Sequence, residues 1–224
     1  MNYIEFLHKL QPECEEAFAA FQRKLVPTQQ KILGIRTPKL RKIAKEAFAF
    51  REEILAYPDE YFEVTLTKAM VIASLPFAEY LKQIESLLDK FDNWAVCDLF
   101  KPKCIAKNKE AYLPYLEKFF HTQKEFLQRH VLIVLLTDYI EPRYYPLIER
   151  FLSEADTDNY YVYMASAWLT AEILVKDYEE GIRILQSEIL DSKTHNKAIQ
   201  KAKESYRLTK QQKEELNTLK NKKR

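Results

Sequence analysis

An indole and a carboxylate stand four residues apart in the segment DNWAVCD at residues 92–98. If this segment is helical, Trp94 and Asp98 share one face, because residues i and i+4 are neighbours on a helix. An aromatic ring beside an anion suits a cationic or cation-like ligand. The alternative is a purely structural role. The tryptophan would then pack in a core, and Asp98 would pair with Lys101 just before Pro102 ends the helix. The choice between these interpretations depends on the rest of the chain.

The elements that must position this pair are predicted to be helices. Glycine is scarce, since the 224 residues contain only Gly34 and Gly181. Turn-rich β folds and phosphate-cradling loops need more glycine than this. The composition therefore argues against Rossmann, P-loop and β-sandwich folds together.

Breaks at proline and Asx residues divide the chain into helical stretches of roughly 12–20 residues. Residues 78–91 and 179–190 carry apolar side chains at spacings of 3 and 4. Thr37 is expected to cap a helix that has Pro38 in its first turn. The apolar run 131–136 is interpreted as buried helix, although a strand is possible. Helix pairs recur about every 30–40 residues, which predicts an all-α solenoid of HEAT-like antiparallel helix pairs, with a compact non-repeating bundle as the alternative.

The charge of the chain is unevenly distributed. Residues 191–224 contain eleven Lys and Arg against four Asp and Glu, a net charge of +7. Since the whole chain carries +2, residues 1–190 carry −5. Such asymmetry suggests a polyanionic partner, while a solubilising C-terminal helix is the simpler alternative. A second basic cluster lies at the predicted helix start and comprises Arg36, Lys39, Arg41, Lys42 and Lys45.

Domain organisation and cellular class follow from the same composition. We expect residues 1–208 to form one domain and the lysine-rich segment 209–224 to be partly frayed. No apolar run approaches ~20 residues and the N-terminus lacks the layout of a signal peptide, so we predict a cytoplasmic protein without a membrane partner. No oligomerisation signal is present, and a monomer is expected. The three cysteines have no metal-ligand spacing and are expected to be reduced thiols: Cys14, Cys97 and Cys104.

Five segments, in order along the chain, together resemble the DNA alkylation repair (AlkD-like) family, the HEAT-like repeat DNA glycosylases. They are the turn and helix start at residues 32–45, the Trp-x-x-x-Asp of residues 92–98, FLQRH at 126–130, ASAW at 165–168, and the run at 194–207. By this resemblance Arg129 stands where the family has its active-site arginine. Trp168 stands at the place of its second aromatic residue.

The resemblance implies a curved solenoid whose concave face holds duplex DNA and which releases N3- or N7-alkylated purines without metal or organic cofactor. An alkylated purine is cationic and leaves readily through an oxocarbenium-like sugar. Asp98 would stabilise that charge and hold the attacking water. Trp94 and Trp168 would press against sugar and base, and Arg129 would bind the adjacent phosphate. The expected contacts to nucleic acid are Arg36, Lys39, Arg41, Lys101, Lys197, Lys201 and Arg207.

Three departures from the family pattern predict a divergent branch. Residues 163–171 read YMASAWLTA and lack the Lys and Arg that flank the second tryptophan in active members. The residues at 25–27, LVP, replace an aromatic near the N-terminal turn. Fewer cations and a net negative charge over residues 1–190 weaken binding to phosphates. The alternative function is therefore a catalytically weak or inactive HEAT-like repeat protein that binds nucleic acid or a protein partner.

Overall fold

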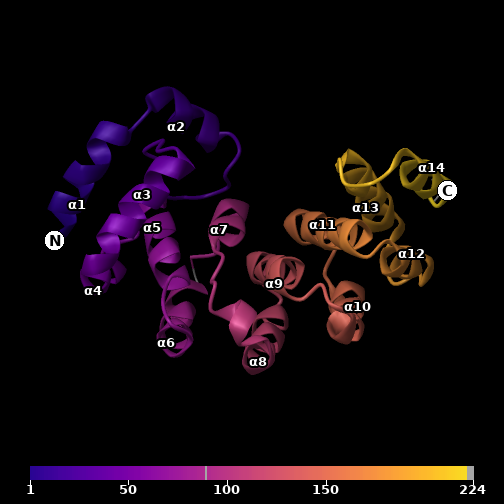
Figure 1. Ribbon diagram of the computed structural model, residues 1–224. Helices are drawn as coiled ribbons and strands as arrows, with labels where there is room; N and C mark the ends of the chain where they lie inside the picture. The colour runs from indigo at the N-terminus through magenta and orange to yellow at the C-terminus, as the bar shows by residue number, and fades with distance from the viewer. Residues whose placement is uncertain (89, 221–224) are drawn as a thin grey trace. The chain divides into compact units, whose positions relative to one another are not determined.

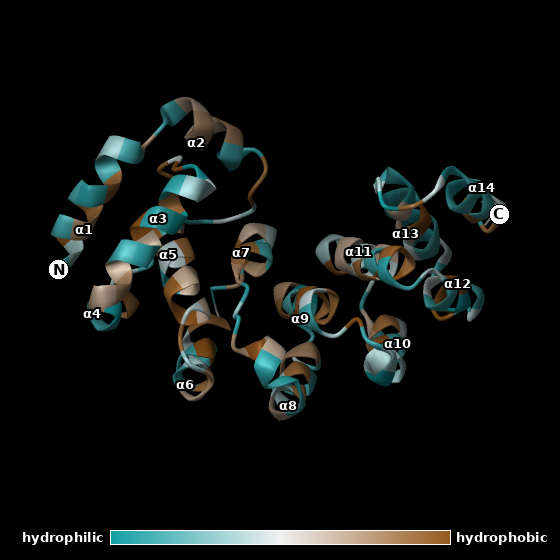
Figure 2. Cartoon of the chain, viewed as in Figure 1, coloured by the Kyte–Doolittle hydropathy of each residue, from teal (hydrophilic) through white to brown (hydrophobic). Residues whose placement is uncertain are grey.

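The computed structural model describes residues 1–88 and 90–220, and regular structure within them is helical (Figure 1). The chain divides into two compact units, Met1–Asn108 and Lys109–Arg224. None of the described helices is both long enough and apolar enough to cross a membrane. Each unit has its own core of buried apolar residues. Figure 2 colours each helix by hydropathy, with hydrophobic residues in brown and hydrophilic residues in teal.

The first unit is organised around one helix, α5 (Phe62–Ala73), which packs against α3, α4, α6 and α7. Almost every α5 side chain is buried, so its sequence is apolar around most of its circumference rather than along one stripe. The surrounding elements are α1 (Tyr3–Leu10), α2 (Glu16–Arg23), α3 (Thr37–Ala47), α4 (Arg51–Leu55), α6 (Phe77–Leu88) and α7 (Trp94–Leu99), with short 3-10 turns at Gln11–Glu13, Phe48–Phe50 and Ile105–Lys107.

A buried carboxylate from α5 fixes the turn that leads into α3. Glu63 accepts hydrogen bonds from the backbone N–H groups of Leu33, Gly34 and Ile35, at 2.9, 2.8 and 3.3 Å. Gly34 has a φ of +82°, and a Cβ placed on it would lie 2.4 Å from the Glu15 carbonyl oxygen. Only glycine fits this conformation and this approach.

The predicted cap of α3 is wrong by one residue. Arg36 is the N-cap in an extended conformation, Thr37 is already the first helical residue, and Pro38 lies in the first turn as expected. No side chain caps the helix. The chain direction is instead set just upstream, where Glu63 binds the turn.

The second unit has two layers. Helices α9 (Glu125–Asp138), α11 (Tyr160–Lys176) and α13 (Ser192–Glu204) pack side by side, and α8, α12 and α14 each cover one of them (Figure 1). Residues 127–135 of α9 are all buried, which confirms the buried helix predicted for the apolar run 131–136. The remaining elements are α8 (Lys109–Phe120), the 3-10 turn Pro142–Tyr144, α10 (Tyr145–Glu154), α12 (Tyr178–Gln186) and α14 (Lys210–Thr218).

The polar C-terminal segment contributes a helix to the second unit. Thr209 and Gln212 form a capping box at the start of α14, and Leu216 is completely buried. Residues 221–224 of the segment expected to fray lie outside the described residues.

Consecutive helices thus pack as repeat pairs within each unit, which confirms the predicted all-α, HEAT-like solenoid class. The concave face implied by the family resemblance involves both units and stays a prediction. The expected domain boundary at residue 208 also stays a prediction.

Candidate functional site

The start of α7 is fixed by a chain of polar contacts within the first unit. The Asn93 side chain, fully buried, accepts a hydrogen bond from Val96 N at 3.0 Å and donates to Asp92 Oδ1 at 2.6 Å. Asp92 Oδ2 accepts a hydrogen bond from Thr28 Oγ1 at 2.8 Å. The segment between α2 and α3 is therefore tied to the first turn of α7.

The structure places Trp94 and Asp98 on α7, one helical turn apart. Trp94 Nε1 donates to the Leu25 carbonyl at 2.9 Å, while part of the indole stays accessible to solvent. Asp98 is also partly buried. Lys101 is exposed and makes no ion pair with any described residue, so the Asp98–Lys101 pair that the sequence allows is not formed.

Arg129 is a buried cation in α9, with 6% of its surface exposed. Its Nη1 donates to the carbonyl oxygen of Tyr161, at the start of α11, at 3.0 Å. In the same turn Tyr161 N donates to Glu125 Oε1 at 2.9 Å. The α9–α11 contact therefore holds the guanidinium in place, and a buried cation of this kind needs an anion or other acceptors around it.

Trp168 lies on α11, partly exposed, and lines a small pocket of about 250 Å³. Lys201 and Arg207, both predicted contacts to nucleic acid, line the same pocket. Arg207 binds Glu172 through both guanidinium ends, at 2.9 and 2.7 Å. The second unit thus brings together one predicted aromatic residue and two predicted cations.

The basic cluster at the start of α3 is largely paired with acids. Arg36 Nε lies 2.9 Å from Glu15 Oε2, and its guanidinium stacks 4.7 Å from the centre of the Phe18 ring. Lys39 Nζ lies 2.8 Å from Glu13 Oε2. Arg41 is exposed and makes no ion pair with a described residue. Two of the three cations predicted here to bind phosphates therefore already have carboxylate partners.

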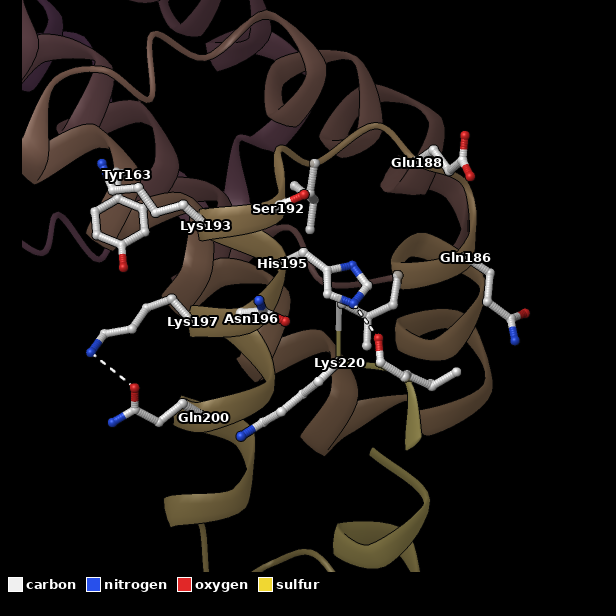
Figure 3. Close-up of a pocket in the computed structure, with 13 residues that line it drawn as sticks. Tyr163, Gln186, Glu188, Ser192, Lys193, His195, Asn196, Lys197, Gln200 and Lys220 are labelled. Carbon is white, nitrogen blue, oxygen red and sulfur yellow. Dashed lines mark hydrogen bonds between the residues drawn. The ribbon is translucent and has the colours of Figure 1, made fainter. Parts of the chain in front are cut away.

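On α13 the cations form a stripe, because Lys193, Lys197 and Lys201 are each four residues apart. Lys193 Nζ lies 4.1 Å from the centre of the Tyr163 ring, and Lys197 Nζ donates to Gln200 Oε1 at 3.2 Å. Both lysines line a second, larger pocket of about 1310 Å³, shown in Figure 3. Lys193 and Tyr163 were not predicted from the sequence as functional residues, although the four-residue spacing of the lysines could have indicated Lys193.

The one histidine with a strongly shifted pKa is structural. His130 is completely buried in α9, and burial lowers its pKa to about 3. Its imidazole is therefore neutral at physiological pH and has no proton to donate as an imidazolium. Within the described residues no group of three or more His, Cys, Asp or Glu is arranged to hold a metal ion.

Comparison with protein families gives a match that spans elements of both units. A model of the DNA alkylation repair enzyme family matches residues 6–201. The chain belongs to this family. The resemblance seen in the five sequence segments is thereby confirmed, and a role in DNA repair follows at the level of the family. The comparison with curated proteins gives no match.

As a DNA alkylation repair family member, the chain divides its candidate residues between the two units. Trp94 and Asp98 belong to the first unit, whereas Arg129 and Trp168 belong to the second. That all four meet at one lesion stays a prediction. Within each unit, the local arrangement is a ring beside a carboxylate on α7, and an aromatic residue beside cations on α11 and α13.

Proposed function

We propose that this protein is a DNA glycosylase that hydrolyses the N-glycosidic bond of cationic N3- or N7-alkylated purines in duplex DNA. The observation that carries the proposal is the geometry of α7 in a chain of the DNA alkylation repair family. Trp94 donates its indole N–H to the Leu25 carbonyl, and Asp98 follows one helical turn later, partly buried. A ring face and a carboxylate are what a cationic nucleoside requires.

The chemistry needs little from the protein beyond charge stabilisation. The C1′–N bond of the lesion breaks, and its electron pair neutralises the positive base. The sugar becomes oxocarbenium-like, and its charge is stabilised by a nearby carboxylate. We assign this role to Asp98, which also takes the proton of the water that adds to C1′. Trp94 packs its ring against the sugar and base.

The second unit supports the proposal through its cations and Trp168. Arg129, whose Nη1 donates to the Tyr161 carbonyl, would bind the phosphate next to the lesion. Trp168 would contact the cationic base. Lys197 and Lys201 would bind the DNA backbone, whereas Arg207, already paired with Glu172, would contribute little, as would Arg36 and Lys39.

A second candidate function is favoured by the α3 cluster. Because Arg36 and Lys39 are paired with Glu15 and Glu13, the first unit presents fewer unneutralised cations than its sequence suggests. A weak hold on duplex DNA would leave a repeat protein that binds nucleic acid or a protein partner without catalysis.

The test is release of free base from duplex DNA that carries N7-methylguanine, corrected for spontaneous loss without protein. We expect release by the wild-type protein and a decrease of roughly 10²–10³-fold in the Asp98→Asn variant, because a preorganised charge is removed. Asp158→Asn, at an exposed aspartate of the second unit, is the matched control and should release base at the wild-type rate. No release by folded wild-type protein would favour the second candidate.

A further inference from the structure

Four aromatic rings form a continuous surface in the second unit, which we call the aromatic strip: Phe126, Tyr161, Tyr160 and Tyr163. Phe126 comes from α9, and the three tyrosines come from the first turn of α11. The ring centres follow one another at 5.0, 5.2 and 6.1 Å. Each ring keeps contact with solvent, and Tyr160 is 58% exposed. Exposed aromatic residues that contact one another mark a binding surface more often than hydrophobic residues scattered singly over the surface do.

The aromatic strip runs directly into a cluster of cations. Its last ring, Tyr163, lies under Lys193 Nζ at 4.1 Å and lines the larger pocket of the unit. Lys197 and Lys220 line the same pocket (Figure 3). His195 also lines this pocket, and its Nε2 donates to the Leu219 carbonyl at 2.8 Å. Ring faces and ammonium groups therefore share one continuous surface.

The lysines of this pocket are not neutralised by acids. Lys193, Lys197 and Lys220 make no ion pair with a described residue, whereas Arg183 of α12 binds both Glu149 and Glu180. Asp191, the carboxylate nearest in sequence, accepts hydrogen bonds from Lys193 N and Thr194 N as the cap of α13. Glu188 is the single carboxylate among the described lining residues. The pocket is thus positive and suited to phosphate groups.

We propose that the aromatic strip and this pocket bind single-stranded DNA. Bases stack on Tyr160, Tyr161 and Phe126, and the backbone phosphates bind Lys193, Lys197 and Lys220. Proteins that hold single strands combine aromatic faces with a basic groove in this way, because every base has a π face. The Tyr160 ring makes angles of 82° and 62° with Tyr161 and Tyr163. Faces turned in different directions suit unstacked bases, whereas the bases of a duplex are turned inward.

This site goes beyond the proposed glycosylase activity and does not depend on it. It uses neither Trp94 nor Asp98, and the binding partner is undamaged DNA. A failure of base release would therefore leave the single-strand site untouched. Because Lys197 is shared with the proposed duplex contact, the variants that test the single-strand site are Tyr160→Ala and Lys193→Gln.

The experiment measures fluorescence anisotropy of the full chain with a labelled oligo(dT) of roughly 12 nucleotides and with a duplex of the same length. Tyr160→Ala should weaken single-strand binding roughly tenfold through loss of stacking, and leave duplex binding nearly unchanged. Tyr160→Phe, which keeps the ring, should bind like the wild type. Tyr206→Ala is the matched control, since Tyr206 is a fully exposed tyrosine of the same unit outside the strip.

The contribution of the lysines to single-strand binding is measured by its salt dependence. Lys193→Gln should reduce the slope of log affinity against log salt by about 0.7 for the single strand, as expected for one lost phosphate contact. Lys210→Gln, at a lysine that is almost fully exposed on α14, is the matched control and should leave the slope unchanged. Thermal unfolding of each variant establishes that it is folded.

Three results would overturn the proposal. The first is a wild-type protein that does not bind the oligonucleotide. The second is a Tyr160→Ala variant that binds it as tightly as Tyr206→Ala. The third is an equal loss of duplex and single-strand affinity, which would make the surface part of the duplex contact instead.

Discussion

Two clusters of cations, one at the start of α3 and one on α13, differ in their partners. In the first unit, Arg36 and Lys39 at the start of α3 lie against Glu15 and Glu13. In the second, Lys193 contacts a tyrosine ring and Lys197 contacts an amide. A cation with a carboxylate partner contributes little net potential at a distance, whereas an unneutralised one attracts phosphate. The comparison agrees with our proposal that the α13 lysines of the second unit bind DNA phosphates and that Trp94 and Asp98 on α7 of the first unit contact the lesion.

The largest expected effect concerns duplex affinity. Lys197→Gln with Lys201→Gln should lower the affinity for duplex DNA by roughly one to two orders of magnitude at about 0.1 M salt, and reduce the salt slope by about 1.8, since two phosphate contacts are lost. Salt titrations monitored by anisotropy measure both quantities. An unchanged salt slope would mean that Lys197 and Lys201 do not contact DNA phosphates, which would contradict the proposed role of the second unit.

The two glycines sharpen the comparison at the level of stability. Gly34→Ala should destabilise the first unit by roughly 3 kcal/mol, because a Cβ would meet the Glu15 carbonyl in a left-handed conformation. Gly181→Ala in α12 should destabilise the second unit by only about 1–2 kcal/mol. There the new Cβ would lie 2.6 Å from the Leu174 Cα and Cδ2, but Gly181 does not have the left-handed conformation of Gly34, and alanine favours helix more than glycine does. Urea unfolding of both variants tests the order, and a larger loss at Gly181 would contradict it.

Acid should affect the second unit before the first. Burial lowers the pKa of His130 to about 3 in the folded state, so the unfolded chain binds this proton more readily. The stability that neutral His130 permits is complete above about pH 6.5 and is lost as the pH falls toward 3, a loss of roughly 2 kcal/mol by pH 5.

In the first unit, Asp59 is the partly buried group whose shifted pKa makes stability depend on pH. Burial alone would raise its pKa, but Lys68 and Lys90 hold it below the usual value, so its contribution is lost only in more acidic solution, as the pH falls below about 4. The free energy of unfolding, measured between pH 7.5 and 5, should therefore fall in the wild type and stay nearly constant in a His130→Leu variant. Equal pH dependence in both proteins would contradict this account.

The smallest expected effect is also the most informative about the first unit. Arg36→Gln with Lys39→Gln should change duplex affinity by less than about twofold, because these cations are already paired. The opposite change, Glu13→Gln with Glu15→Gln, should release them and increase affinity a few-fold with a steeper salt dependence. A large loss in the first variant would show that both units hold phosphates.

Local pattern was enough to predict the helices and the α7 pair. Spacings of 3 and 4 encode a helical face, and the scarcity of glycine argues against turn-rich β folds. The buried α9 and the shared helix of Trp94 and Asp98 therefore follow from neighbours in sequence. Thr37 was misplaced as the cap because the preceding turn is fixed by Glu63, twenty-nine residues away from Gly34. Such a contact has no local signature.

The same limit applies to the candidate site. The basic residues of α3 could be found by counting, but their neutralisation by Glu13 and Glu15 depends on how α3 packs beside the segment before α2. Arg129 could be predicted to need a partner, yet that partner includes a backbone carbonyl, at Tyr161, which residue types do not reveal. Tyr163 and Lys193 meet only because α11 packs against α13.

The most direct test of the division between the units measures binding and chemistry in the same two variants. Asp98→Asn and Lys197→Gln/Lys201→Gln are compared with the wild type for duplex affinity, and for the single-turnover rate of N7-methylguanine release at saturating protein. We predict that Asp98→Asn loses the rate and keeps the affinity, whereas the lysine variant loses affinity and keeps the rate. A lysine variant that saturates but releases no base, or an Asp98→Asn variant that no longer binds, would contradict the assignment of chemistry to the first unit and phosphate binding to the second.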